Sequence, residues 1–162
     1  MDNIERKIPA IKNGSVIDHI PSRDTFRIMR ILDPQEFIHP ISVTLNLHSK
    51  KMGKKGVIKI DNRFLTKKEV NKIAILAPNV TVSIIKDYKI VEKIEVKIPT
   101  ELVGIINCSN PVCVTNKEEA STSFKVIRED PLEVKCLYCE KEVKCLYCEK
   151  VYGKDEVELK KK

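Results

Sequence analysis

The sequence predicts an α+β chain with a larger N-terminal domain, residues 1–99, and a small C-terminal domain, residues 100–162. Three observations support this division. Short strand-like alternations and two helical patterns fill the N-terminal part. A proline, Pro99, follows the last of these strands. All six cysteines lie beyond it, between Cys108 and Cys148. We therefore expect an apolar core to stabilise the first domain, whereas the second is too short to fold without a further crosslink.

The composition is that of an ordinary globular protein. Of the 162 residues, 42% are hydrophobic, which is too many for a disordered chain. No apolar run approaches the length of a transmembrane helix, and nothing at the N-terminus reads as a signal peptide, so we expect a soluble, cytoplasmic protein without a membrane partner. The formal net charge of +7 suggests a polyanionic partner. However, acidic residues are interleaved with the lysines, and a solvated charged surface explains the charge at least as well.

The first elements are a strand, a helix and a second strand. Residues 15–20 form a short strand that ends at Pro21, and Ser22 is expected to cap the next helix. The Asp33-Pro34 pair ends that helix. Residues 41–47 then alternate between apolar and polar, which predicts a half-buried strand. The buried stripe of the helix is predicted to contain Phe26, Ile28, Met29, Ile31 and Leu32.

The second half of the N-terminal domain repeats this pattern. Residues 56–60 are the returning strand of a hairpin. Thr66 and Glu69 have the spacing of a capping box, which begins a helix that ends at Pro78. Two further strands, residues 81–86 and 90–98, follow. The order strand–helix–strand–strand–helix–strand, with one added strand, is the ferredoxin-like βαββαβ pattern, in which both helices cover one face of a sheet.

The uncovered face of this sheet is a candidate binding surface. The apolar neighbours of Lys59 and Lys93 alternate toward the predicted core, so both lysines project from the open face. Exposed lysines are common on any surface. Here, however, they come from separate strands and converge near Asp18 and His19, which makes an anion-binding pocket a reasonable hypothesis.

The cysteines predict one structural zinc ion. Cys108 and Cys113 form one pair, Cys136 and Cys139 a second, and Cys145 and Cys148 a third. Two pairs on short turns supply four thiolates around Zn²⁺ and leave no position open for water or substrate. Disulfides are less consistent with the sequence, because thiols in a cytosolic chain stay reduced.

One cysteine pair is nevertheless in excess. Residues 133–141 and 142–150 are the same nonapeptide, EVKCLYCEK. A tetrahedral site that uses Cys108 and Cys113 needs only one of the two copies. The repeat is either a recent tandem duplication or an artefact of how the sequence was obtained, and the residues alone do not separate these two explanations.

Several motifs, in order, resemble the regulatory chain of aspartate carbamoyltransferase. These are Asn13–Pro21, Leu45–Leu47 with Met52–Lys55, Ile58–Ile60, Val91–Lys93, and the Cys-x4-Cys and Cys-x-Tyr-Cys-Glu-Lys turns. The resemblance extends from about Ala10 to Tyr152. It implies a non-catalytic subunit with an N-terminal allosteric domain that binds CTP and ATP, and in some members UTP. It also implies a C-terminal zinc domain that docks on the catalytic chain, and an assembly in which the regulatory chains are dimers.

The resemblance also assigns site residues. Ala10 and Ile11 would lie beside the base, Asp18 near the ribose, and His19 and Lys93 would face the phosphates. Lys59 would contact the ribose and base edge, and Tyr88 and Ile90 would line the base. Ser83 and Ile85 complete the nucleotide set, and Ser83 stands where the family commonly has Asn, so the polar side chain at this position is shorter.

For the zinc ion, the family spacing favours Cys108, Cys113, Cys136 and Cys139. The residues after Cys148 continue as the family's C-terminal strand does, so Cys145 and Cys148 remain the alternative second pair.

Two other functions fit the sequence less well. A basic zinc-ribbon protein that binds nucleic acid would fit the charge, but aromatic residues make up only 5% of the chain and no strand carries stacking aromatics. A redox enzyme would open a helix with its Cys-x-x-Cys motif, which is not the context here. No nucleophile, base and orienting residue occur together, so we expect no catalytic residues. Because stacking aromatics are lacking, we also expect no nucleic-acid partner.

Overall fold

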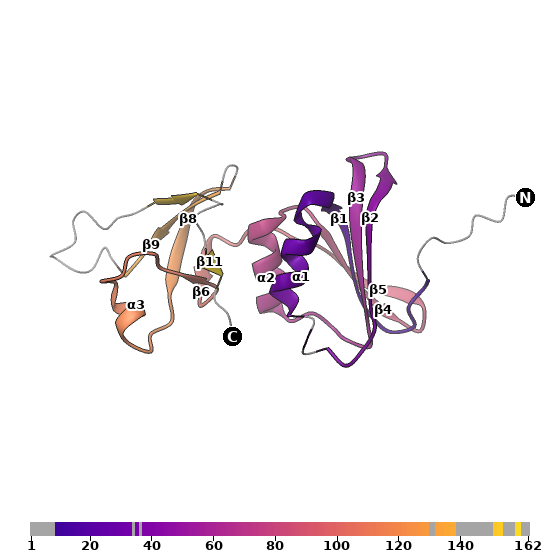
Figure 1. The fold of residues 1–162 in the computed structure, drawn as a ribbon, viewed down its shortest axis with the longest axis horizontal. Coiled ribbons are helices and arrows are strands. Elements are labelled where there is room, and N and C mark those ends of the chain that lie inside the picture. Colours follow the sequence, from indigo (N-terminus) through magenta and orange to yellow (C-terminus); the bar gives the residue numbers. More distant parts are fainter. Residues whose placement is uncertain are drawn as a thin grey trace, which may run out of the picture. The chain divides into compact units, whose positions relative to one another are not determined.

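The computed structural model describes residues 9–33, 35, 37–129, 132–138, 151–153 and 158–159. The chain divides into two compact units, Met1–Lys97 and Ile98–Lys162. Figure 1 shows the elements of both units, which are treated separately below.

The first unit is a five-stranded antiparallel sheet with two helices. Its strands are β1 (Gly14–Pro21), β2 (Ile41–Ser49), β3 (Gly53–Asp61), β4 (Thr81–Lys86) and β5 (Lys89–Glu95), in the order β2-β3-β1-β4-β5. Helix α1 (Thr25–Leu32) connects β1 to β2, and α2 (Lys67–Leu76) connects β3 to β4. Both helices lie on the same side of the sheet in Figure 1. This arrangement confirms the predicted βαββαβ order with β5 as the added strand.

The core of this unit lies between the sheet and the helices. Ile17, Ile58 and Val82, from β1, β3 and β4, are fully buried, as are Ile28 of α1 and Ile73 of α2. Each such side chain stabilises the fold by roughly 1.5–3 kcal/mol relative to an exposed position. Because side chains alternate along a strand, the neighbours of these residues point to the face without helices.

The start of the first helix differs from the prediction. A 3₁₀ turn, η1 (Ser22–Asp24), precedes α1. Neither η1 nor α1 has a side-chain capping hydrogen bond, so the prediction that Ser22 is a cap was wrong. Phe26 is 61% exposed and does not belong to the buried stripe. The face of α1 that packs on the sheet instead contains Thr25, Ile28 and Leu32, which are spaced by three and four residues.

Strand β2 is largely half-buried, as expected for an edge strand, but its alternation is interrupted. The register with β3 shifts between Thr44 and Leu47, and Asn46 has a φ of 58° there. A bulge of this kind rotates the following side chains relative to the preceding ones. The sequence of residues 41–47 alternates without interruption, but because of this bulge its apolar side chains do not all lie on one face of the strand.

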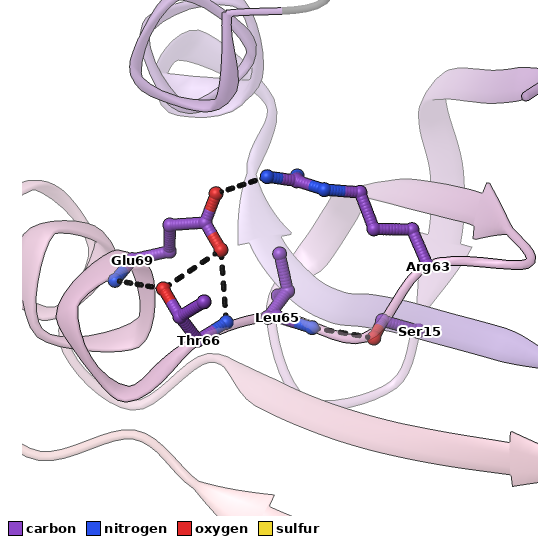
Figure 2. A network of polar contacts seen from close by, with 5 residues as sticks. All are labelled: Ser15, Arg63, Leu65, Thr66 and Glu69. Carbon is purple, nitrogen blue, oxygen red and sulfur yellow. Dashed lines mark hydrogen bonds and ion pairs between the residues drawn. The ribbon is translucent and has the colours of Figure 1, made fainter. Parts of the chain in front are cut away.

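Helix α2 begins with the predicted capping box (Figure 2). The Glu69 amide donates to Thr66 Oγ1 at 3.3 Å, and the Thr66 amide donates to Glu69 Oε2 at 2.8 Å. Arg63 Nη2 lies 2.6 Å from Glu69 Oε1, and the Leu65 amide donates to the buried Ser15 Oγ at 3.1 Å. Burial acts to raise the pKa of Glu69, but the hydrogen bonds from Thr66 and the Arg63 guanidinium outweigh it and lower that pKa. The network thereby connects the start of α2 to β1.

The second unit is a small β structure. Its main sheet has the order β10-β9-β8-β6, formed by β6 (Glu101–Val103), β8 (Ser123–Glu129), β9 (Leu132–Cys136) and β10 (Val151–Gly153). A second pair joins β7 (Ile106–Asn107) to β11 (Glu158–Leu159). Strands β8 and β9 pair as an antiparallel hairpin, and the single-turn helix α3 (Val114–Lys117) was not predicted. Leu102, Phe124 and Val134 are fully buried and form the core.

Within the described residues, no helix is both long and apolar enough to cross a membrane.

Candidate functional site

A row of paired residues crosses the open face of the first sheet. Lys59 of β3 is paired with Val16 of β1, Val16 with Ser83 of β4, and Ser83 with Lys93 of β5. Directly paired residues point to the same face of an antiparallel sheet. Lys59 and Lys93 therefore share the face opposite the helices, separated by three strand spacings, or about 14 Å.

The neighbouring row on the same face contains Asp18, Thr81 and Glu95. Lys55 Nζ lies 2.8 Å from Asp18 Oδ1, and the His19 amide donates to Asp18 Oδ1 at 2.6 Å. Burial acts to raise the pKa of Asp18, but these hydrogen bonds and the Lys55 charge lower it below its ordinary value. Asp18 is thus an ionised acceptor with its orientation fixed.

His19 occupies the bulge that interrupts the β1–β3 register, with a φ of 59°. Its Nδ1 is buried, has no hydrogen-bond partner among the described residues, and lies 3.7 Å from Asp18 Oδ2. His19 borders a hollow of about 400 Å³. The β5 members of the two rows, Lys93 and Glu95, border the same hollow. The hollow is lined by His19, Lys51, Asn79, Thr81, Lys93 and Glu95.

Of these lining residues, only His19 and Lys93 were singled out from the sequence. Thr81 could have been found, because it lies two residues before Ser83 and so on the same strand face. Lys51 belongs to the basic turn that joins β2 to β3. Asn79 has no such signal, because it follows α2 in a turn with a φ of 69°.

The other predicted residues lie toward the opposite end of β1 and β4. Lys59 Nζ donates to the Pro9 carbonyl at 2.7 Å, and the Tyr88 amide donates to the Lys12 carbonyl at 2.9 Å. These two bonds flank Ala10 and Ile11 and hold that segment against the sheet. Ser83 and Ile85 are buried, whereas Tyr88 and Ile90 are 66% and 61% exposed at the β4–β5 turn.

The predicted residues therefore form an elongated surface instead of one compact cluster. One end is apolar and rich in backbone groups, around Ala10, Ile11, Tyr88 and Ile90. The other end holds the charged groups beside Asp18. Gly14 and Asp18 of β1 mark the two ends, four residues or roughly 13 Å apart along the strand. Such a surface suits an extended ligand with an apolar head and an anionic tail.

In the second unit, three cysteines come together. The Sγ atoms of Cys108, Cys113 and Cys136 all lie within 4.8 Å of one another, with Cys113 and Cys136 at 4.0 Å. All three are buried. With Zn–S bonds of about 2.3 Å, the edge of a tetrahedral site is about 3.8 Å, so the cluster fits a thiolate-bound metal ion. The predicted fourth ligand, Cys139, and the alternative pair, Cys145 and Cys148, lie outside the described residues.

These features define a class of protein: an α+β domain with a polar hollow on its open sheet face, followed in the chain by a small domain whose cysteine cluster fits a metal ion. The family comparison makes this class specific. Residues 6–97 match the family model described as aspartate carbamoyltransferase regulatory chain, allosteric domain, and residues 100–144 match the metal binding domain of the same chain.

Curated relatives agree with both matches. The aspartate carbamoyltransferase regulatory chain of Bacteroides thetaiotaomicron is 49% identical over 136 residues, which cover 84% of this chain and 89% of that one. The regulatory chain of Pyrococcus abyssi is 47% identical over 139 residues, covering 85% and 91%. The chain belongs to the family of aspartate carbamoyltransferase regulatory chains. The family resemblance is confirmed, and with it a regulatory instead of a catalytic role in pyrimidine biosynthesis.

Proposed function

We propose that this chain binds CTP and ATP, and also UTP, competitively on the open face of the N-terminal sheet. The effect reaches the catalytic chain of aspartate carbamoyltransferase through the C-terminal domain. The chain acts as a cytoplasmic regulatory dimer within that assembly. The observation that carries the proposal is the hollow that contains His19 and Lys93 at one end of an elongated polar surface.

The charged end of this surface suits a triphosphate. Lys51 and Lys93 border the hollow, and Lys55 lies beside it on Asp18. Ammonium groups from separate elements raise the local concentration of an anion and stabilise it once bound. Asp18, already held by Lys55 and the His19 amide, retains acceptor capacity for a ribose hydroxyl.

The opposite end suits the base. Ala10 and Ile11 supply backbone donors and acceptors beside Lys59, and Tyr88 and Ile90 supply apolar surface. Backbone groups read the edge of a base, and apolar side chains cover its face. The short, buried Ser83 lies between Lys59 and Lys93 in the row and gives a weaker polar contact than a longer amide side chain.

For the C-terminal domain we propose one structural Zn²⁺ ion held by Cys108, Cys113, Cys136 and Cys139, with Cys145 and Cys148 as the alternative second pair. Three of these sulfurs already have the spacing of a thiolate site. When bound, the ion crosslinks β7, the start of α3 and the end of β9. For a unit with so small a core, metal binding contributes directly to folding.

Regulation then requires that each nucleotide distinguish two quaternary states. A ligand shifts an equilibrium only by the difference between its affinities for the two states. CTP is expected to favour the arrangement of low activity and ATP the arrangement of high activity. Because both nucleotides use the same surface, each should displace the other.

Calorimetric titration of the zinc-loaded chain with CTP, followed by ATP, tests the binding site. The expected result is saturable binding at one site per chain, competition by ATP, and loss of most of the affinity in Lys93→Ala. Lys68→Ala is the matched control, because Lys68 is an exposed lysine of α2, on the other side of the sheet. Equal CTP affinity in Lys93→Ala and the wild type would contradict the proposed site.

A further inference from the structure

The single-turn helix α3 begins directly after Cys113 and contacts both cysteines of the first pair. Thr115 Oγ1 lies 3.1 Å from Cys113 Sγ, and both residues are buried. Asn116 Nδ2 donates to the carbonyl oxygens of Cys108 and Asn110, each at 2.7 Å. Two adjacent side chains of α3 therefore contact the candidate metal site from outside its ligand shell.

The two contacts act on different parts of the site. Asn116 binds backbone carbonyls, so it fixes the course of the loop from Cys108 to Cys113. The Thr115 hydroxyl, in contrast, contacts the ligand atom itself. A cysteine that binds a metal does so as a thiolate, which has no proton to give. In the metal-bound chain the Thr115 hydroxyl must therefore be the donor and the Cys113 sulfur the acceptor.

A hydrogen bond to a coordinating thiolate has two consequences. It holds the sulfur in one direction, which lowers the entropy lost on metal binding, and it stabilises the negative charge on that sulfur. Because the contact is buried, water cannot replace the donor without entering the site. Outer-shell partners of metal ligands typically change metal affinity by roughly 10–100-fold when they are removed.

We infer that Thr115 is an outer-sphere positioning residue of the metal site, whose hydroxyl donates a hydrogen bond to the Cys113 thiolate. The inference rests on the proposed metal site and deepens it. It concerns one sulfur only, and does not depend on which second cysteine pair completes the site.

The test compares three variants of the full chain. Thr115→Val keeps the shape of the side chain and removes the hydroxyl, whereas Thr115→Ser keeps the hydroxyl and removes a methyl group. Thr122→Val is the matched control, because Thr122 is also buried in the same unit but donates to the Ile106 carbonyl, not to sulfur. Each protein is loaded with Zn²⁺, and separately with Co²⁺ as a spectroscopic probe.

Two readouts are measured: metal affinity, by competition with a chromophoric chelator, and the energy of the thiolate-to-cobalt charge-transfer absorption. The expected result for Thr115→Val is about tenfold weaker metal binding. Its charge-transfer band should also move to lower energy, because electrons on an unbonded thiolate are easier to transfer. Thr115→Ser and Thr122→Val should keep the wild-type band.

Three outcomes would overturn the inference. These are an unchanged band in Thr115→Val, a band shift of similar size in Thr115→Ser, or a shift in Thr122→Val. If Thr115→Val does not fold, Thr115→Ala takes its place, since it also lacks the hydroxyl, and the inference requires its band to move to lower energy than that of Thr115→Ser. Absence of metal binding by the wild-type chain would instead refute the proposed metal site, so the two failures are distinguishable.

Discussion

Glu95 shares the hollow with His19, Lys51 and Lys93, and is the one acidic residue among the described residues that line it. A carboxylate at this position partly cancels the positive potential that a triphosphate would meet. Neutralising it should therefore strengthen nucleotide binding, whereas removing Lys93 weakens it. Opposite effects from neighbouring charges would be difficult to explain by a general change in stability.

We expect Glu95→Gln to raise the CTP affinity about fivefold, which corresponds to about 1 kcal/mol of relieved repulsion near a protein surface. Calorimetry at low and high salt measures the effect, which should shrink at high salt as ions screen the charges. Glu92→Gln is the control: Glu92 is paired with Ile84, in a row that faces the helices. A loss of CTP affinity in Glu95→Gln would show that the carboxylate contributes a favourable contact instead.

Gly56 is a second residue whose neighbours determine what can replace it. A Cβ atom at this position of β3 would lie 2.2 Å from Thr25 Oγ1 and 3.2 Å from Thr25 Cβ. Thr25 is fully buried at the start of α1 and cannot move away freely. The absence of a side chain at Gly56 therefore allows α1 to approach the sheet closely.

Gly56→Ala is expected to lower the free energy of unfolding by about 1–3 kcal/mol, as overpacking does in well-packed cores. The double variant Gly56→Ala/Thr25→Ala should recover part of this loss, because the hydroxyl that clashes is gone. Urea unfolding of the single and double variants measures the coupling between the two positions. Strictly additive effects would exclude a direct clash.

At the scale of elements, the start of α2 depends on an ionised Glu69. The carboxylate accepts from Thr66 and pairs with Arg63, and its pKa is lowered below the ordinary value of 4.5. A carboxyl group with a lower pKa in the folded state contributes stability that is present above pH 4.5. That contribution is lost as the pH falls from 4.5 through the folded-state pKa.

Relative to Glu69→Gln, the wild type should be more stable by about 1 kcal/mol at pH 7, and this advantage should shrink as the pH falls below 4.5. The free energy of unfolding in urea, measured for both proteins from pH 3 to pH 7, gives the comparison. Glu92 is an exposed residue outside the network, so the free energy of unfolding of Glu92→Gln should change with pH in the same way as that of the wild type. An advantage that stays constant down to pH 3 would exclude the ionised carboxylate as its source.

The elements themselves were largely predictable, and the exceptions have physical causes. Alternation and the capping box identified the strands and α2, because these signals are local. Bulges at His19 and Asn46 were not predictable, since a register shift depends on the partner strand. The single-turn helix α3 is too short to produce a periodic pattern, and with it the contacts of Thr115 and Asn116 went unseen.

The binding surface was predictable in the same partial way. Lys59 and Lys93 were placed on the open face by alternation alone, and pairing through Val16 and Ser83 puts them in one row. The acidic residue in the hollow, Glu95, was missed, because nothing in the local pattern shows that strand ends and turns from β2, β4 and β5 enclose a single space.

At the scale of the whole molecule, the two units differ in what stabilises them. The first has a core of aliphatic side chains from all its central strands and both helices. The second has short strands and a cluster of three buried cysteines. A small core supplies only a few kcal/mol, so the second unit should depend on its metal ion.

Metal removal by a strong chelator should therefore unfold the C-terminal unit and leave the N-terminal unit folded. Amide hydrogen exchange, followed by mass spectrometry, measures both units in one sample. Protection should be lost for residues 101–136 and retained for β1, β3 and β4, and added Zn²⁺ should restore it. Loss of protection in both units would contradict their independence.

The measurement that tests the central claim most directly is the aspartate saturation curve of the catalytic chain after assembly with this chain. We predict a sigmoidal curve that saturating CTP shifts to higher aspartate concentration and saturating ATP shifts to lower concentration. Lys93→Ala in the same assembly should make the curve insensitive to both nucleotides. A wild-type curve that neither nucleotide moves would contradict allosteric control by this chain.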